Sequence, residues 1–213
     1  MTLTIRSLVA AAIVLIASQS GFAQTYNESG DATDLPGGQS VTDGTTTILG
    51  TNDVNDPDLY AFSWGGGILT MDAGGTDDFD PQLHLFESDG TGIAENDDGA
   101  DGSNICGGFN CSEISLDLPG GVYLLAMTEF NNDALDAGGN PVFGFTNTFS
   151  DLNGNLIQAP EGNGPLAGWD GLGNGVGGAY TINFSSPVNA VPEPAGFGLL
   201  LLGMAALLRV RRK

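Results

Sequence analysis

Residues 59–71 read LYAFSWGGGILTM, two short apolar runs that meet at three consecutive glycines. Ahead of the glycines, Tyr60, Phe62 and Trp64 take every second position, the period at which the side chains of a β-strand point to one face. Glycine accepts the backbone angles of a tight turn, so the chain is expected to reverse here and to continue as a second strand over 68–71. The segment predicts a β-hairpin.

The same kind of pattern recurs along the chain. Residues 82–86 (QLHLF) pass through Asp89-Gly90, the strongest short-range turn signal, into a returning strand over 93–95. Residues 114–118 alternate, a Pro-Gly-Gly turn follows, and the continuous apolar run 122–127 is typical of a central buried strand. We interpret these as a second and a third hairpin.

Composition completes the prediction of fold class. With 34 glycines and 10 prolines, the chain favours many tight turns between strands over long helices. We predict an all-β fold, a jelly-roll-like antiparallel β-sandwich over 49–186, flanked by an N-terminal signal helix and a C-terminal transmembrane helix. Residues 131–178 read as an insertion, and a leader over 24–48 is expected to add an edge strand around 45–49. A strand over 180–184 is expected to close the sandwich before a Ser-Ser-Pro linker.

Basic residues occur only at the two ends of the chain, at Arg6 and within 209–213, although the formal net charge is −21. An acidic body repels nucleic acid and anionic lipid, so both are excluded as partners. Cations and neutral sugars remain as partner classes.

The amino end is typical of a secretory signal. Arg6 precedes the apolar run 8–17, and Gly21-Phe22-Ala23 supplies the small residues of a signal peptidase site before Gln24. We therefore expect signal peptidase to remove residues 1–23.

The carboxyl end, 187–213, combines a proline-rich start, the apolar stretch 195–208 and the basic tail 209–213. The tail is expected to stay in the cytoplasm. At about 1.5 Å per residue the apolar helix would cover about 21 Å of a hydrocarbon core about 30 Å thick, which favours a temporary membrane hold over a permanent anchor. An ordinary tail anchor is the alternative.

This tail resembles the PEP-CTERM sorting signal of Gram-negative bacteria that make exopolysaccharide. The resemblance rests on Val191, Pro192, Glu193 and Pro194, followed by the apolar helix and the Arg-rich terminus. It implies recognition of that motif by an exosortase-type membrane protease. The protein would be held briefly in the inner membrane and then reach the cell surface or the extracellular space.

The body resembles a second family, the bacterial pre-peptidase C-terminal domain. The resemblance rests on 53–62 (DVNDPDLYAF), 79–86 (FDPQLHLF), 95–98 (ENDD) and 119–123 (PGGVY). It implies a small β-sandwich of the kind found beside secreted enzymes and on surface proteins, often linked to calcium or to matrix binding. The chain departs from the family in the insertion and in the lack of an attached peptidase.

Acidic residues gather at the open end of the second predicted hairpin. Antiparallel pairing around Asp89-Gly90 places Asp80 near Gly99 and Gln82 near Asp97. Two carboxylates about 5 Å apart repel by about 3 kcal/mol at an effective dielectric of about 20, which favours a bound counter-ion. We predict one structural Ca²⁺, with a solvated turn rim as the alternative. The candidate ligands are Asp78, Asp80, Asn96, Asp97, Asp98 and Asp101.

A second acidic turn, Asp53, Asp56 and Asp58, is a secondary candidate for cation binding. Its alternative is an ordinary turn in which side-chain oxygens bond backbone amides.

The two cysteines, Cys106 and Cys111, close a short loop in an exported chain, so we predict a disulfide. A metal site or a redox pair are the alternatives. Two thiols without a nearby histidine make a weak zinc set, and the spacing is not C-x-x-C.

The sequence offers little for catalysis. His84 is the only histidine and is expected on an outer or half-buried strand face, and no Gly-x-Ser-x-Gly elbow occurs. We predict a non-enzymatic surface or matrix protein. The alternative is a carbohydrate-binding module for exopolysaccharide, with Trp169 as the candidate for stacking on sugar rings and a local packing anchor as its other interpretation.

Overall fold

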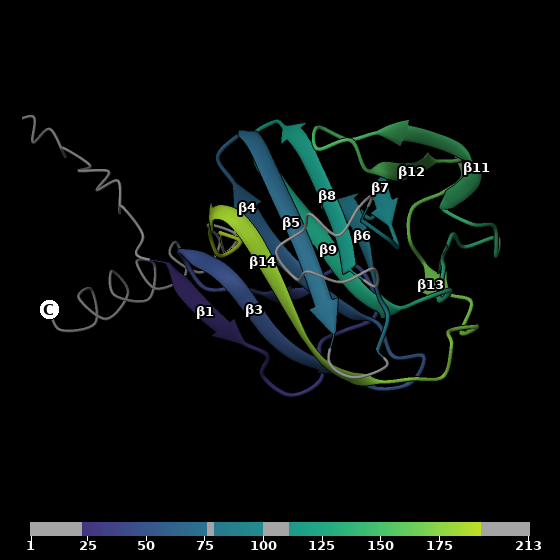
Figure 1. Cartoon of the computed structure of the whole chain (residues 1–213), viewed down its shortest axis with the longest axis horizontal. Coiled ribbons are helices and arrows are strands. Elements are labelled where there is room, and N and C mark those ends of the chain that lie inside the picture. The colour runs from purple at the N-terminus through teal and green to yellow at the C-terminus, as the bar shows by residue number, and fades with distance from the viewer. Residues whose placement is uncertain (1–22, 76–78, 100–110, 193–213) are drawn as a thin grey trace, which may run out of the picture.

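The computed structural model describes residues 23–75, 79–99 and 111–192, and every regular element among them is a β-strand (Figure 1). The all-β prediction is confirmed for these ranges. The predicted signal helix and membrane helix lie outside the described residues.

The strands form two large sheets that pack face to face as a sandwich. In order across the first sheet lie β1 (Gln24–Asn27), β3 (Thr45–Asn52), β14 (Gly178–Val188), β5 (Gly67–Gly75) and β8 (Cys111–Leu118). In order across the second sheet lie β11 (Phe143–Ser150), β12 (Leu156–Pro160), β7 (Gly92–Asn96), β6 (Pro81–Glu87), β9 (Gly121–Glu129), β4 (Asp58–Trp64) and β2 (Gln39–Ser40). The short strands β10 (Ala134–Leu135) and β13 (Gly168–Trp169) pair with each other.

Neighbouring strands run antiparallel in all these pairs except β1 with β3 and β2 with β4, which are parallel. Both exceptions come from the predicted leader. The leader also differs from expectation in its edge strand, because β3 lies inside the first sheet and β1 takes the edge.

Two of the three predicted hairpins are wrong. Strands β4 and β5 belong to different sheets, and so do β8 and β9; β4 pairs with β9, and β5 pairs with β8. The glycine-rich turns therefore carry the chain from one sheet to the other. They lie against each other, since a Cβ on Gly66 would be 3.1 Å from the backbone nitrogen of Gly120.

The hairpin through Asp89-Gly90 is confirmed. Strand β6 pairs with β7, with Leu83 opposite Asn96, His84 opposite Glu95, and Leu85 opposite Ala94, which is the predicted register. Nearer the turn the register shifts, since Phe86 pairs with Gly92 and the Glu87 nitrogen bonds the Thr91 carbonyl, so the turn is not the predicted two-residue turn.

The main core lies between the sheets, where the alternating side chains of each strand point inward. Tyr60 and Phe62 from β4 and Leu125 from β9 are fully or almost fully buried there, as the alternation predicted, whereas Trp64 is only half-buried. The hydroxyl of Tyr180 on β14 bonds that of Tyr60 across the core and donates to Asp58 Oδ2 at 2.8 Å.

The insertion builds a second core on the outer face of the second sheet. Leu59, Phe86 and Leu124 point to that face and are covered by Phe143 and Leu166. The second sheet is thus buried on both faces, which a glycine-rich insertion did not lead us to expect.

Gly66 and Gly65 form a matched pair for testing the crossing turn. Gly66 has φ of +101° and little room for a Cβ, whereas Gly65 has ordinary backbone angles and no atom within 4 Å of its Cβ position. We expect Gly66→Ala to lower the free energy of unfolding by about 1–3 kcal/mol and Gly65→Ala to change it by under about 0.5 kcal/mol. Urea denaturation measures both, and equal effects would contradict the described turn.

Candidate functional site

The open end of the β6–β7 hairpin brings together part of the predicted calcium site. Asp80 precedes β6, and Asp97 and Asp98 follow Asn96 at the end of β7. Asp78 and Asp101 lie outside the described residues. We call Asp80, Asp97 and Asp98 the mouth carboxylates.

Burial raises the pKa of all three mouth carboxylates, and neighbouring charge adds to it at Asp80 and Asp97. Burial, then the charges of Asp98 and Asp80, raise the pKa of Asp97 to about 7. Burial and the charge of Asp98 likewise raise the pKa of Asp80. The Oδ1 atoms of Asp80 and Asp97 are buried and have no hydrogen-bond partner. Two buried acceptors are thus left without a donor.

Asn96, the amide in the predicted ligand set, is already engaged. Its Oδ1 accepts from the backbone nitrogen of Glu113 at 2.8 Å, and its Nδ2 donates to the carbonyl of Asp98 at 3.1 Å. The amide therefore shapes the mouth by tying it to β8, and its carbonyl oxygen is not turned toward a ligand.

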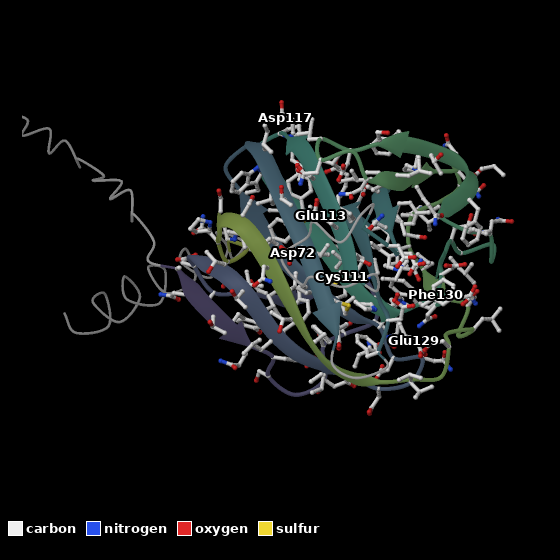
Figure 2. All side chains as sticks on the ribbon, viewed as in Figure 1. Asp72, Cys111, Glu113, Asp117, Glu129 and Phe130 are labelled. Atoms are coloured by element: carbon white, nitrogen blue, oxygen red, sulfur yellow. The ribbon has the colours of Figure 1, made fainter. Side chains whose placement is uncertain are left out.

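Other buried carboxylates are supplied with donors. Glu129, fully buried at the end of β9 (Figure 2), accepts from the backbone nitrogens of Asn55 at 2.7 Å and of Gly175 and Val176 at 2.9 Å each. Asp151 accepts from the backbone nitrogens of Ser115 and Asn155 at 2.9 and 2.8 Å. Among the described residues, Oδ1 of Asp80, Oδ1 of Asp97 and Oδ2 of Asp72 lack such donors.

A second pair of facing carboxylates lies on the outer face of the first sheet (Figure 2). Asp72 on β5 stands opposite Glu113 on β8, and both are buried. Burial raises the pKa of Asp72, a hydrogen bond from Asn183 lowers it, and the charge of Glu113 raises it. Glu113 Oε1 accepts from the Nδ2 of Asn155 at 2.8 Å. Sequence reasoning missed this pair because it assigned β5 to a hairpin with β4.

The secondary acidic turn is divided by the structure. Asp53 and Asp56 line a shallow pocket with Asp31 from the leader, whereas Asp58 is buried beneath it on β4. Burial and the charge of Asp31 raise the pKa of Asp56. Asp31 was missed, because the pairing of leader and body could not be read from the sequence.

Within the described ranges, no group of three or more His, Cys, Asp or Glu side chains is arranged to hold a metal ion. The three mouth carboxylates are therefore not arranged as a metal site by themselves, and the predicted calcium stays a prediction.

His84 lies on the outer face of β6, one of the two positions expected for it, but the side chain is fully buried there. The insertion is the reason, since the rings of Trp169 and Phe143 lie 5.1 and 5.9 Å from the imidazole. His84 Nδ1 is 3.0 Å from Glu95 Oε2, and Nε2 is 3.0 Å from the hydroxyl of Thr128.

Trp169, the candidate for sugar stacking, is half-buried on β13. Its indole Nε1 donates to the carbonyl of Asp34 at 2.7 Å, and its ring meets His84 and Phe86 edge to face. These contacts make Trp169 the joint between leader, insertion and second sheet. Its binding of a glycan stays a prediction.

Two predicted features fall partly outside the described residues. The first is the disulfide. Cys106 lies outside the described residues and Cys111 is buried at the start of β8, so the bridge between them stays a prediction. Of the sorting motif, Val191 and Pro192 are described, and Glu193 and Pro194 are not.

The sequence stretch that was read as a linker is in fact structured. Strand β14 runs through 185–187 to Val188, beyond the predicted end of the sandwich. In the ranges that the structure describes, no helix is long and apolar enough to cross a membrane. The predicted membrane stretch, 195–208, lies outside them.

No known protein family and no curated protein matches the sequence. Among solved structures, the chain is similar to the pre-peptidase C-terminal domain of a collagenase from Bacillus anthracis. The TM-score is 0.38 at 11% sequence identity, and the match covers 78% of this chain and 96% of that chain.

The pKa of Asp97 predicts that stability falls as pH rises. Because its pKa is raised to about 7, the folded protein keeps a proton that the unfolded chain releases near about pH 4. The stabilisation is complete below about pH 4 and is lost as pH rises through 7. Allowing for partial exposure, we expect it to total about 1–2 kcal/mol.

Thermal unfolding in chelator at constant ionic strength measures this slope between pH 5 and 8. Asp97→Asn should make the slope shallower but not flat, because Asp58, whose pKa burial raises to about 8, contributes a slope of the same sign. Asp117→Asn, at an exposed position on β8, should leave the slope unchanged. A steeper decline in Asp97→Asn than in the wild-type protein would contradict the assignment.

Proposed function

We propose that the chain is an exported, non-enzymatic protein of the cell surface or extracellular matrix, released by an exosortase-type membrane protease. The observation that carries the proposal is the order of the tail, with Val191-Pro192-Glu193-Pro194 ahead of the apolar stretch 195–208 and the basic run 209–213. The start of the folded body supports the export part of the proposal, because strand β1 starts at Gln24, the residue after the predicted signal peptidase site.

The non-enzymatic part of the proposal is supported by where the reactive groups lie. His84 is sealed beneath Trp169 and Phe143, and Glu129 is saturated by backbone donors. Neither side chain is available to a substrate as it stands. The proposed role of the body is therefore to be displayed at the cell surface or in the matrix and not to convert a substrate.

Cell fractionation tests the export and sorting proposal. In a host with the sorting protease, we expect a mature form that begins at Gln24 and lacks the basic tail, outside the inner membrane. Without the protease, or with Pro192→Ala and Glu193→Ala in the motif, the chain should stay in the inner membrane. The matched control is Glu161→Ala, at an exposed position outside the motif, which should be sorted like the wild type. An intact Arg-rich terminus on the exported form would overturn the proposal.

We further propose that the mouth carboxylates hold one structural Ca²⁺. Support comes from the two buried, unpartnered Oδ1 atoms of Asp80 and Asp97 and from the lack of any basic residue between 7 and 208. Calcium accepts carboxylate and carbonyl oxygens in flexible geometry, and extracellular modules bind it at about 0.1–1 mM.

Calcium at about 100 times its Kd should stabilise the folded protein by about 2.7 kcal/mol and raise its Tm. We expect Asp80→Asn and Asp97→Asn to abolish that rise, and Asp53→Asn, in the other acidic pocket, to retain it. Thermal unfolding with calcium and then with chelator measures the effect. A wild-type Tm that ignores both would rule out the site, and loss of the rise in Asp53→Asn alone would move the site to the leader pocket.

A further inference from the structure

Residues Asn189–Val191 follow strand β14 and are hydrogen-bonded to the rest of the folded body. We call them the exit segment. Each of their backbone N–H groups is taken: Asn189 donates to the Ser63 carbonyl at 3.0 Å, Ala190 to Asp43 Oδ1 at 3.0 Å, and Val191 to Ser40 Oγ at 3.1 Å. The segment is therefore bonded in place, with no free backbone donor.

The carbonyls of Asn189 and Ala190 are held as well. The carbonyl of Asn189 accepts from the Ser63 backbone nitrogen at 2.8 Å, and that of Ala190 accepts from Ser63 Oγ at 3.1 Å. The side chain of Val191 packs on the second core. Just upstream, Val188 is fully buried. The exit segment thus continues the chain from β14 alongside β4. Its contacts with the body extend to Val191, the first residue of the sorting motif.

This geometry bears on proteolysis. Val191 and Pro192 are the first two residues of the motif, so the folded body extends into the sequence that the sorting protease is proposed to recognise. Backbone that is bonded and packed resists cleavage, and proteases act on the fraction of molecules in which such a segment has opened. Cleavage beside Val191 therefore depends on the opening of the exit segment.

We infer that Ser40, Asp43 and Ser63 clamp the exit segment and that its opening sets the rate at which the sorting protease releases the body; this rests on the proposed function. Ser40 and Asp43 belong to the leader, 151 and 147 residues earlier in the chain than their partners. The clamp is therefore complete only after the whole body has folded. In an unfolded chain the motif is accessible to the protease. In a folded chain the exit segment must first detach from the body before the protease can reach the motif.

Pulse-chase labelling of the full chain in a host with the sorting protease tests the inference. Asp43→Ala removes the acceptor for the Ala190 amide, and we expect it to be processed about tenfold faster than wild type. Asp43→Asn keeps an Oδ1 acceptor and should be processed within about twofold of wild type. Ser40→Ala should accelerate processing in the same direction as Asp43→Ala.

A variant that weakens the body elsewhere separates the clamp from general instability. Tyr180→Phe removes the hydroxyl that joins Tyr60 and Asp58 inside the core, far along β14 from the exit segment. It should lower Tm but leave the processing rate unchanged. Hydrogen exchange on the purified full chain gives a second readout, and the amides of Ala190 and Val191 should exchange about tenfold faster in Asp43→Ala than in Tyr180→Phe.

The outcomes are distinguishable. Equal processing rates in wild type, Asp43→Ala and Ser40→Ala overturn the clamp and leave the sorting proposal standing. Acceleration in Tyr180→Phe equal to that in Asp43→Ala assigns the effect to global unfolding and also overturns the clamp. A chain that no variant makes cleavable overturns the sorting proposal together with the inference.

Discussion

The fold depends on hydrogen bonds that stabilise buried carboxylates in the absence of basic side chains, because no Lys or Arg occurs between residues 7 and 208. Backbone amides and Asn side chains take over that task. Glu129 joins the turn at Asn55 to the loop before β14 through three backbone N–H groups. The approach is so close that a Cβ on Gly173 would collide with the Glu129 side chain. Buried acids are therefore the joints of this fold, and hydrogen bonds from neutral groups supply what ion pairs supply elsewhere.

Some buried carboxylates receive hydrogen bonds from neutral donors on both oxygens, and others do not. The carboxylates with an unpartnered oxygen mark the candidate sites. Where loops wrap around an acid, as at Asp151, both oxygens are satisfied. At the mouth of the β6–β7 hairpin the described strands end, the Oδ1 atoms of Asp80 and Asp97 have no hydrogen-bond partner, and burial raises the pKa of both carboxyls. His84, the one histidine, lies against the Glu95 carboxylate beneath the insertion and does not reach the mouth carboxylates. Protons and external cations are thus the remaining ways to neutralise the mouth.

The alternation of apolar residues predicted which face of a strand is buried, and Tyr60 and Phe62 lie in the core as that pattern requires. The Asp89-Gly90 turn signal also predicted the hairpin and most of its register correctly. Neither signal says which sheet a strand joins, so Gly65–Gly67 and Pro119–Gly121 were read as hairpin turns although they cross between layers. The burial of His84 and the pairing of Asp31 with Asp56 arise from contacts between distant segments, which local patterns do not encode.

Gly44 touches both ends of the body. Its carbonyl accepts from the backbone nitrogen of Gln24 at 3.1 Å, and its nitrogen donates to the carbonyl of Val188 at 2.9 Å. The folded chain is therefore nearly a closed ring, with its entry and its exit at one corner. Such a ring can be opened at another loop and joined at this corner without a long bridge, as in circular permutation. Under the proposed export route, the two proposed processing enzymes would approach the same corner of the molecule.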